Sequence, residues 1–133
     1  MTAIPNTLEL AGRAIVDIPS FYAEINRVFM ADETWALAES LDALNDLLYG
    51  GYGAIDGRAP VELVWREMEA SRAALGIETT RAWLLEKLQS PATFNTDVIR
   101  NQLDALERGE GQTYFDIILE IIGDHRNIML VPA

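Results

Sequence analysis

Acidic and aromatic side chains are concentrated in one short stretch of the sequence, and they are the strongest candidates for a chemical role. The polar and aromatic members of this group are Trp35, Glu39, Asp42, Asn45, Asp46, Tyr49 and Tyr52. Carboxylates at such density can bind a cation or take part in acid–base chemistry. No Lys or Arg occurs between Arg27 and Arg58, although this stretch holds six carboxylates. The neighbouring sequence therefore offers these acids no counter-ion.

A second acidic group lies near the C-terminus. Asp116, Glu120 and Asp124 follow one another at four-residue spacing, and no Lys or Arg occurs between Arg108 and Arg126. On a helix this spacing places like charges side by side, which is mildly destabilising. Repetition of that cost suggests that something outside the chain benefits from the charges.

Catalytic and metal-binding functions find little support. The only histidine is His125, with no H-E-x-x-H pattern around it, and we expect it on the surface or at a helix C-terminus. The sequence contains no G-x-S-x-G, phosphate-binding or dinucleotide-binding pattern. Asp42 and Asp46 are a carboxylate pair, yet nothing in the sequence indicates a raised pKa. We expect no enzyme activity, no catalytic residue, no metal and no cofactor.

Length and charge restrict the remaining classes. A chain of 133 residues is expected to form one domain, residues 1–133. Its 10 basic and 21 acidic residues give a net charge of −11, which argues against direct binding to nucleic acid. The chain has no cysteine, no signal-like start and no apolar run that would span a membrane. We expect a cytoplasmic protein that is monomeric when free, and solubility alone is the simplest alternative explanation of its charge.

Strand and helix patterns alternate along the chain. Strands are predicted at Thr7–Leu10, Val61–Trp65 and Asn127–Val131, where short apolar runs are bounded by turn residues. Helices are predicted from Ile18 to Phe29, after Ser40, at Glu67–Leu75, Glu78–Leu88 and Asp97–Leu106, and after Thr113, with Gly123 as a possible early end. Because strands separated by helices need crossover connections, we predict an α/β fold with a small parallel sheet.

The helix after Ser40 has two distinct faces. At helical periodicity Leu41, Leu44 and Leu48 share one side, while Glu39, Asp42 and Asp46 lie on the other. A solvated polar face is the simple interpretation, but such faces usually carry both signs of charge. Tyr49 and Tyr52 follow this acidic face in a glycine-rich loop, and the combination is more typical of a protein-binding edge. Elsewhere in the chain, Trp65 and Trp83 fall on apolar faces and are predicted to be core residues.

Two segments resemble the barstar family of ribonuclease inhibitors. They are Ser40–Leu48, which reads S-L-D-A-L-N-D-L-L, and the apolar strand Val61–Arg66, which ends in Trp and a basic residue. The resemblance covers about residues 7 to 75 and 113 to 131. It implies a three-stranded parallel sheet packed by helices, and about residues 76–112 look like a helical insertion.

The resemblance also implies a partner. Members of that family bury an acidic helix and its adjoining loop in the cationic active site of a basic extracellular guanyl-preferring ribonuclease. Asp42 and Asp46 match the two aspartates of the family helix, with Asp46 as the central phosphate mimic, and Glu120 and Asp124 match acids on the last helix. The implied function is ribonuclease inhibition by protein–protein contact, without direct contact to nucleic acid or membrane. The alternative is an acidic interaction or regulatory module that uses the same edge on a basic partner other than a nuclease.

The sequence departs from the family pattern at two positions. Asn45 stands where the family often has tryptophan, and Gly51 lies where a second interface aromatic is common. We therefore expect that Tyr49, Tyr52 or Trp35 supplies the missing aromatic contact. The resemblance assigns no role to the insertion.

Overall fold

A three-stranded parallel sheet forms one side of the molecule in the computed structural model, which describes residues 6–133. The strands are β1 (Asn6–Ala11), β2 (Val61–Arg66) and β3 (Ile128–Pro132), in the spatial order β1–β2–β3. Leu10 on β1 pairs with Trp65 on β2, and Leu63 on β2 pairs with Leu130 on β3. The predicted parallel three-stranded sheet is confirmed.

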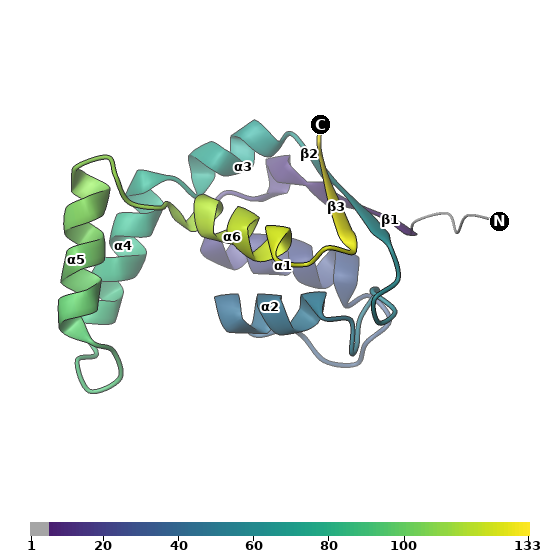
Figure 1. Ribbon diagram of the computed structural model, residues 1–133, viewed down its shortest axis with the longest axis horizontal. Helices are drawn as coiled ribbons and strands as arrows, with labels where there is room; N and C mark the ends of the chain where they lie inside the picture. The colour runs from purple at the N-terminus through teal and green to yellow at the C-terminus, as the bar shows by residue number, and fades with distance from the viewer. Residues whose placement is uncertain (1–5) are drawn as a thin grey trace.

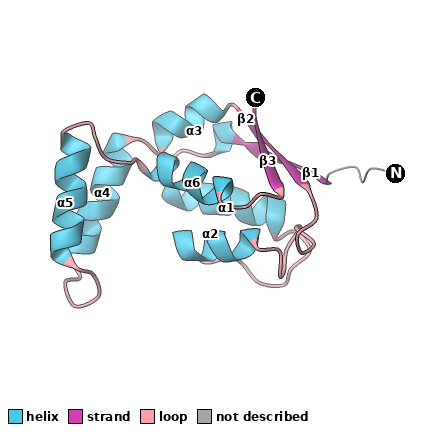
Figure 2. Ribbon diagram, viewed as in Figure 1, coloured by secondary structure: helices cyan, strands magenta, loops and turns pink. Residues whose placement is uncertain are grey.

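Six helices connect the strands among the described residues, so the predicted α/β class is also confirmed (Figures 1 and 2). A short 3₁₀ turn, Gly12–Ala14, follows β1. The helices are α1 (Ile18–Phe29), α2 (Leu41–Leu48), α3 (Met68–Ala74), α4 (Ile77–Leu88), α5 (Thr96–Glu107) and α6 (Tyr114–Gly123). In this part of the chain no helix is both long and apolar enough to cross a membrane.

Side-chain caps fix where α2 and α6 begin. The Ser40 hydroxyl accepts a hydrogen bond from the Ala43 amide at 3.1 Å, and Thr113 accepts one from the Asp116 amide at 3.2 Å. The Asp116 carboxylate in turn accepts from the Thr113 amide at 3.0 Å, which completes a capping box. Both predicted caps are confirmed, but Asp116 serves the fold rather than an acidic binding stripe. Gly123 does not shorten α6 by a turn, because it is the last residue of the helix.

The core lies between the sheet and the helices, with Trp65 at its centre. This side chain is 0 % exposed, and its ring lies 6.1 Å from Phe21 and 5.4 Å from Phe115, centroid to centroid. Its indole N–H donates to the Ser71 hydroxyl at 2.9 Å, so the polar atom of the buried ring is satisfied. The central strand and helices α1, α3 and α6 are thereby held by one side chain, as its predicted core position requires.

Helices α4 and α5 form a hairpin that stands beside this body (Figure 1). Its own small apolar cluster consists of the buried Leu84, Ile99 and Leu106. One link to the main body is the ring contact between Trp83 and Tyr114, whose centroids are 4.9 Å apart. Trp83, predicted as a core residue, is only partly buried. Its remaining surface is open to the space between the hairpin and the main body.

Candidate functional site

Helix α2 turns an apolar face inward and an acidic face outward. Leu44, Leu47 and Leu48 are buried in the core, whereas Asp42 and Asp46 are exposed. The two aspartates are four residues apart, so they lie on the same side, about 6 Å from one another along the helix axis. The fold therefore presents both carboxylates to solvent from a short helix that is anchored by its leucines.

No basic side chain of the described residues forms an ion pair with this acidic face. Residues 6–133 form seven ion pairs within 4.0 Å, and none includes a carboxylate from the stretch between Arg27 and Arg58. Four arginines between the sheet strands β2 and β3 are paired elsewhere: Arg72 with Glu69, Arg81 with Glu107, Arg100 with Asp97, and Arg108 with Glu110. The expectation that Asp42 and Asp46 lack intramolecular counter-ions holds throughout this part of the molecule.

Lys87 on α4 is a cation whose charge interacts with the acidic face at longer range. Burial lowers the pKa of Lys87, and the carboxylate of Asp42 opposes this shift. The ammonium group nevertheless lies against aromatic rings, with Nζ 3.8 Å from the Trp83 centroid and 5.2 Å from that of Phe94. Lys87 therefore weakens the negative field near the start of α2 without neutralising Asp42 by direct contact.

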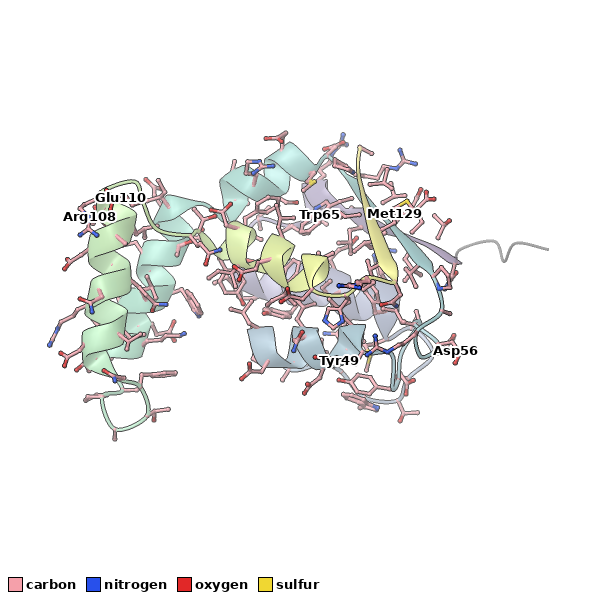
Figure 3. All side chains as sticks on the ribbon, viewed as in Figure 1. Tyr49, Asp56, Trp65, Arg108, Glu110 and Met129 are labelled. Carbon is pink, nitrogen blue, oxygen red and sulfur yellow. The ribbon has the colours of Figure 1, made fainter. Side chains whose placement is uncertain are left out.

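Aromatic side chains lie beside the acidic face. Tyr49, at the end of α2 that leads into the loop, is 57 % exposed (Figure 3). Trp35 is 47 % exposed, and its ring centroid lies 4.9 Å from that of Tyr52. Burial raises the pKa of Tyr52, and the nearby charge of Asp46 adds to the effect. Trp35, Tyr52 and Asp46 thus belong to one region, which combines apolar contact area with negative charge.

The glycine-rich loop after α2 is held in a defined shape. Gly50 has φ +83°, and a Cβ at this position would lie 2.0 Å from the Gly57 carbonyl oxygen. The Gly57 amide donates to the Gly50 carbonyl at 2.9 Å, and the Gly53 amide donates to the Glu33 carboxylate at 3.0 Å. Only glycine fits at position 50 without a shift of the backbone. The loop therefore holds Tyr52 in a fixed place relative to α2.

Asn45 forms a hydrogen bond with His125, which lies far from it in the sequence. Its Oδ1 lies 2.8 Å from His125 Nε2, and the Tyr49 ring packs edge-on against the imidazole at 4.8 Å between centroids. His125 directly follows the Asp124 cap of α6, so its expected position at a helix C-terminus is confirmed. It is 6 % exposed, however, and therefore not a surface residue. Burial lowers its pKa, as does Arg58, while Asp124 opposes the shift. The histidine fixes Asn45 and Tyr49 rather than contacting solvent.

Helix α6 brings the second acidic stretch next to the first, because α2 and α6 pack against each other (Figure 1). Glu120 and Asp124 are both exposed. The Glu120 carboxylate accepts a hydrogen bond from Gln112 Nε2 at 2.6 Å, and Asp124 caps the end of the helix. Neither forms an ion pair within the part of the chain that the structure describes. Segments that are distant in sequence therefore contribute to one anionic side of the fold.

Glu39 differs from the other predicted binding residues. Helical periodicity had placed Glu39 on the acidic face of α2, and this prediction is wrong. Glu39 precedes the Ser40 cap and therefore lies outside the helix. The structure places it instead on a pocket between α1 and α4. No local sequence pattern indicates a role for Lys87 or for this pocket, because both depend on how the α4–α5 hairpin packs.

The arrangement is suited to contact with a cationic surface. Among residues 6–133, no group of three or more His, Asp or Glu side chains is placed to hold a metal ion. The surface offers exposed carboxylates on α2 and α6, flanked by the aromatic rings of Trp35 and Tyr49. A comparison of the chain with protein-family models and with curated proteins finds no match.

Proposed function

We propose that this chain is a barstar-like inhibitor, which places the acidic face of α2 and the adjoining loop in the cationic active site of a ribonuclease. The observation that carries the proposal is the state of Asp42 and Asp46. Both are exposed on a rigid helix, and neither forms an ion pair with a described residue of the chain. Charges that the fold itself leaves without partners are available to a partner protein.

The chemistry of RNA cleavage supports this choice of partner. A ribonuclease must present basic side chains to the phosphates of its substrate, so its active site attracts an anionic protein. At contact, carboxylates form charge-assisted hydrogen bonds with Arg, Lys or His, and these are about twice as strong as neutral ones. Asp46, whose charge acts on Tyr52, is proposed to occupy a phosphate position, with Asp42 one turn earlier on the same helix.

The fold adds further support. The parallel three-stranded sheet agrees with the architecture that the resemblance implies, and α2 connects β1 to β2 as the matching segment requires. Tyr49, which contacts His125 together with Asn45, and Trp35 are exposed, and they are the candidates to replace the tryptophan that the family pattern has at position 45. Exposed aromatic side chains of this kind commonly anchor protein–protein interfaces.

A basic partner other than a nuclease is the second candidate, and the state of Asn45 favours it. This residue is hydrogen-bonded to the buried His125 instead of presenting a free ring at the centre of the surface. A partner adapted to the usual tryptophan would lose that contact. The same anionic edge would then serve a protein with a differently shaped basic surface.

Variants of Asp46 and Asp104 test whether the acidic face of α2 binds a partner or serves solubility alone. Asp104 is exposed on α5 and matches Asp46 in charge, but it lies away from α2. We expect Asp46→Ala to weaken binding to a basic guanyl-preferring extracellular ribonuclease by at least about 30-fold, because a buried charge contact is worth about 2 kcal/mol or more. Asp104→Ala should change the affinity by less than about threefold, through long-range attraction alone.

Surface plasmon resonance at low and moderate salt measures both effects. Association of the wild-type protein should slow as salt increases, whereas the Asp46→Ala loss should be seen mainly in dissociation. Equal small losses for both variants would argue against the inhibitor. Recovery of only non-nuclease proteins on the immobilised chain, with loss of that binding in Asp46→Ala, would support the second candidate.

A further inference from the structure

A pocket of about 670 Å³ separates the α4–α5 hairpin from the main body. Trp83, Lys87 and Phe94 line it from the hairpin, and Glu39 lines it from the segment that leads into α2. Because Glu39 directly precedes the Ser40 cap, the pocket lies next to the start of α2, and the charge of Asp42 acts on Lys87 within it.

The charges that line the pocket favour a cationic ligand. Asp17, Glu39 and Glu86 contribute three carboxylates, against the single ammonium group of Lys87. Hydrogen bonds from Ser20 lower the pKa of Asp17, so this group is ionised at neutral pH. An anionic ligand would meet three like charges and only one opposite charge.

Lys87 shows that the aromatic wall accepts a cation. Its ammonium nitrogen lies over the Trp83 ring and close to Phe94, at 3.8 and 5.2 Å from the two centroids. Both distances are within the range of cation–π attraction. Lys87 forms no ion pair with any described residue, although carboxylates line the same pocket. The rings are therefore the direct contacts of this partly buried charge.

We propose that this pocket receives an arginine side chain of the basic partner, and that Lys87 occupies its place in the free protein. The inference rests on the proposed function, since it extends the same binding surface onto the α4–α5 hairpin. A guanidinium group is planar and more weakly hydrated than an ammonium group, so it stacks better on an aromatic ring. On binding, the arginine displaces Lys87 from Trp83 and its charge is matched by Glu39 and Glu86.

The pocket can be tested without the partner, with N-acetyl-L-arginine amide as the probe. N-acetyl-L-citrulline amide has nearly the same shape without the charge and serves as the control. We expect the arginine compound to shift the Trp83 indole N–H signal in an NMR titration that saturates, and the citrulline compound to leave it unchanged. The Trp83 signal is assigned by its absence in Trp83→Leu. Equal shifts from both compounds, or no shift from either, would overturn the proposal.

Two variants give opposite expected effects. Glu39→Gln should weaken binding of the arginine probe by about threefold or more, since it removes one carboxylate of the pocket. Lys87→Met should strengthen it by about threefold or more, because the internal competitor is gone and its stem volume is kept. Asp104→Asn, which removes an acid on the same hairpin but outside the pocket, should leave the affinity unchanged.

The Lys87 variant tests whether Lys87 and the arginine probe compete for the same place. If Lys87→Met weakened binding of the arginine probe or left it unchanged, Lys87 would not be a competitor for the aromatic wall, and that result would overturn the proposal. Lys87→Gln provides a second variant in case methionine disturbs packing, and the amide spectrum of each variant reports whether the fold is kept. Because the probe assay contains no ribonuclease, its failure leaves inhibition by α2 intact. Conversely, an intact arginine site in a chain that binds no ribonuclease would count against the proposed function alone.

Discussion

Replacement of Asp46 by asparagine should stabilise the free protein, because this exposed carboxylate forms no ion pair with any described residue. Asp46 lies in the last turn of α2, where the helix dipole disfavours a negative charge, and it is four residues from Asp42. Loss of the repulsion between these two acids is worth about 0.2–0.5 kcal/mol. Relief of the dipole interaction adds about 0.3–1 kcal/mol. We therefore expect Asp46→Asn to raise the free energy of unfolding by about 0.5–1.5 kcal/mol at low salt.

Asp42→Asn is the matched control for this prediction. Asp42 lies in the first turn of the same helix, where the dipole favours a carboxylate. Its removal gives up that attraction while relieving the same repulsion, so the free energy of unfolding should change little or fall slightly. The two aspartates share a helix and a face, and both are exposed. They differ in their position along the dipole and in the attraction between Asp42 and Lys87, and both differences favour a carboxylate at position 42 over one at position 46. Asp46→Asn should therefore stabilise the fold more than Asp42→Asn.

Urea unfolding, followed by tryptophan fluorescence and circular dichroism, measures both variants. For a domain of this length, 1 kcal/mol corresponds to roughly 3–4 °C in Tm, so thermal melts provide a second readout. Added salt should reduce the gain of Asp46→Asn, because the charges are exposed and screened. If Asp46→Asn lowered the free energy of unfolding by about 1 kcal/mol or more, the Asp46 carboxylate would stabilise the fold. That result would contradict the premise that Asp46 makes no stabilising contact within the protein.

Two further predictions concern buried ionisable groups. Glu24 is 4 % exposed and accepts hydrogen bonds from the Ala11 amide at 2.5 Å and from Arg27 at 2.7 Å, so Glu24→Gln should destabilise the fold by about 2 kcal/mol at neutral pH. Arg27 and the Ala11 amide lower the pKa of Glu24 from its ordinary value of 4.5. The stability that the Glu24 carboxylate contributes is therefore fully present above pH 4.5 and is lost as the pH falls through the lowered pKa. In that range the urea midpoints of the wild type and Glu24→Gln should converge. The pKa of His125 is also lowered from its ordinary value of 6.5, so the folded state favours the neutral ring; urea midpoints should be constant above about pH 6.5 and decline below it. This decline should be missing from His125→Ala, and an NMR titration of the ring that gave a pKa above 6.5 would contradict the assignment.

Local patterns were sufficient to predict the architecture. Strand Val61–Trp65 and the alternation of strands with helices indicated a parallel sheet, and Ser40 and Thr113 marked helix starts that the structure confirms. The same periodicity placed Asp42 and Asp46 opposite the leucines of α2. These features depend on residues a few positions apart, so short-range spacing contains the necessary information.

Contacts between distant segments could not be predicted in this way. Asn45 and His125 are 80 positions apart, and nothing near either residue indicates that they meet in the fold. The pocket around Lys87 likewise depends on how the hairpin packs, which a single helix pattern does not determine. Asp116 is a different case, because Thr113 three residues earlier marks a capping pattern that could have assigned its carboxylate to the helix start.

Titration of a basic guanyl-preferring extracellular ribonuclease with this protein is the most direct test of the central claim, which is that the acidic face of α2 occludes a cationic active site. With RNA cleavage as the readout, we predict that activity falls linearly and is abolished near one inhibitor per enzyme. The Asp46→Ala variant should require a large excess to reach the same inhibition. Full enzyme activity in the presence of excess wild-type protein, across a panel of such ribonucleases, would contradict the claim.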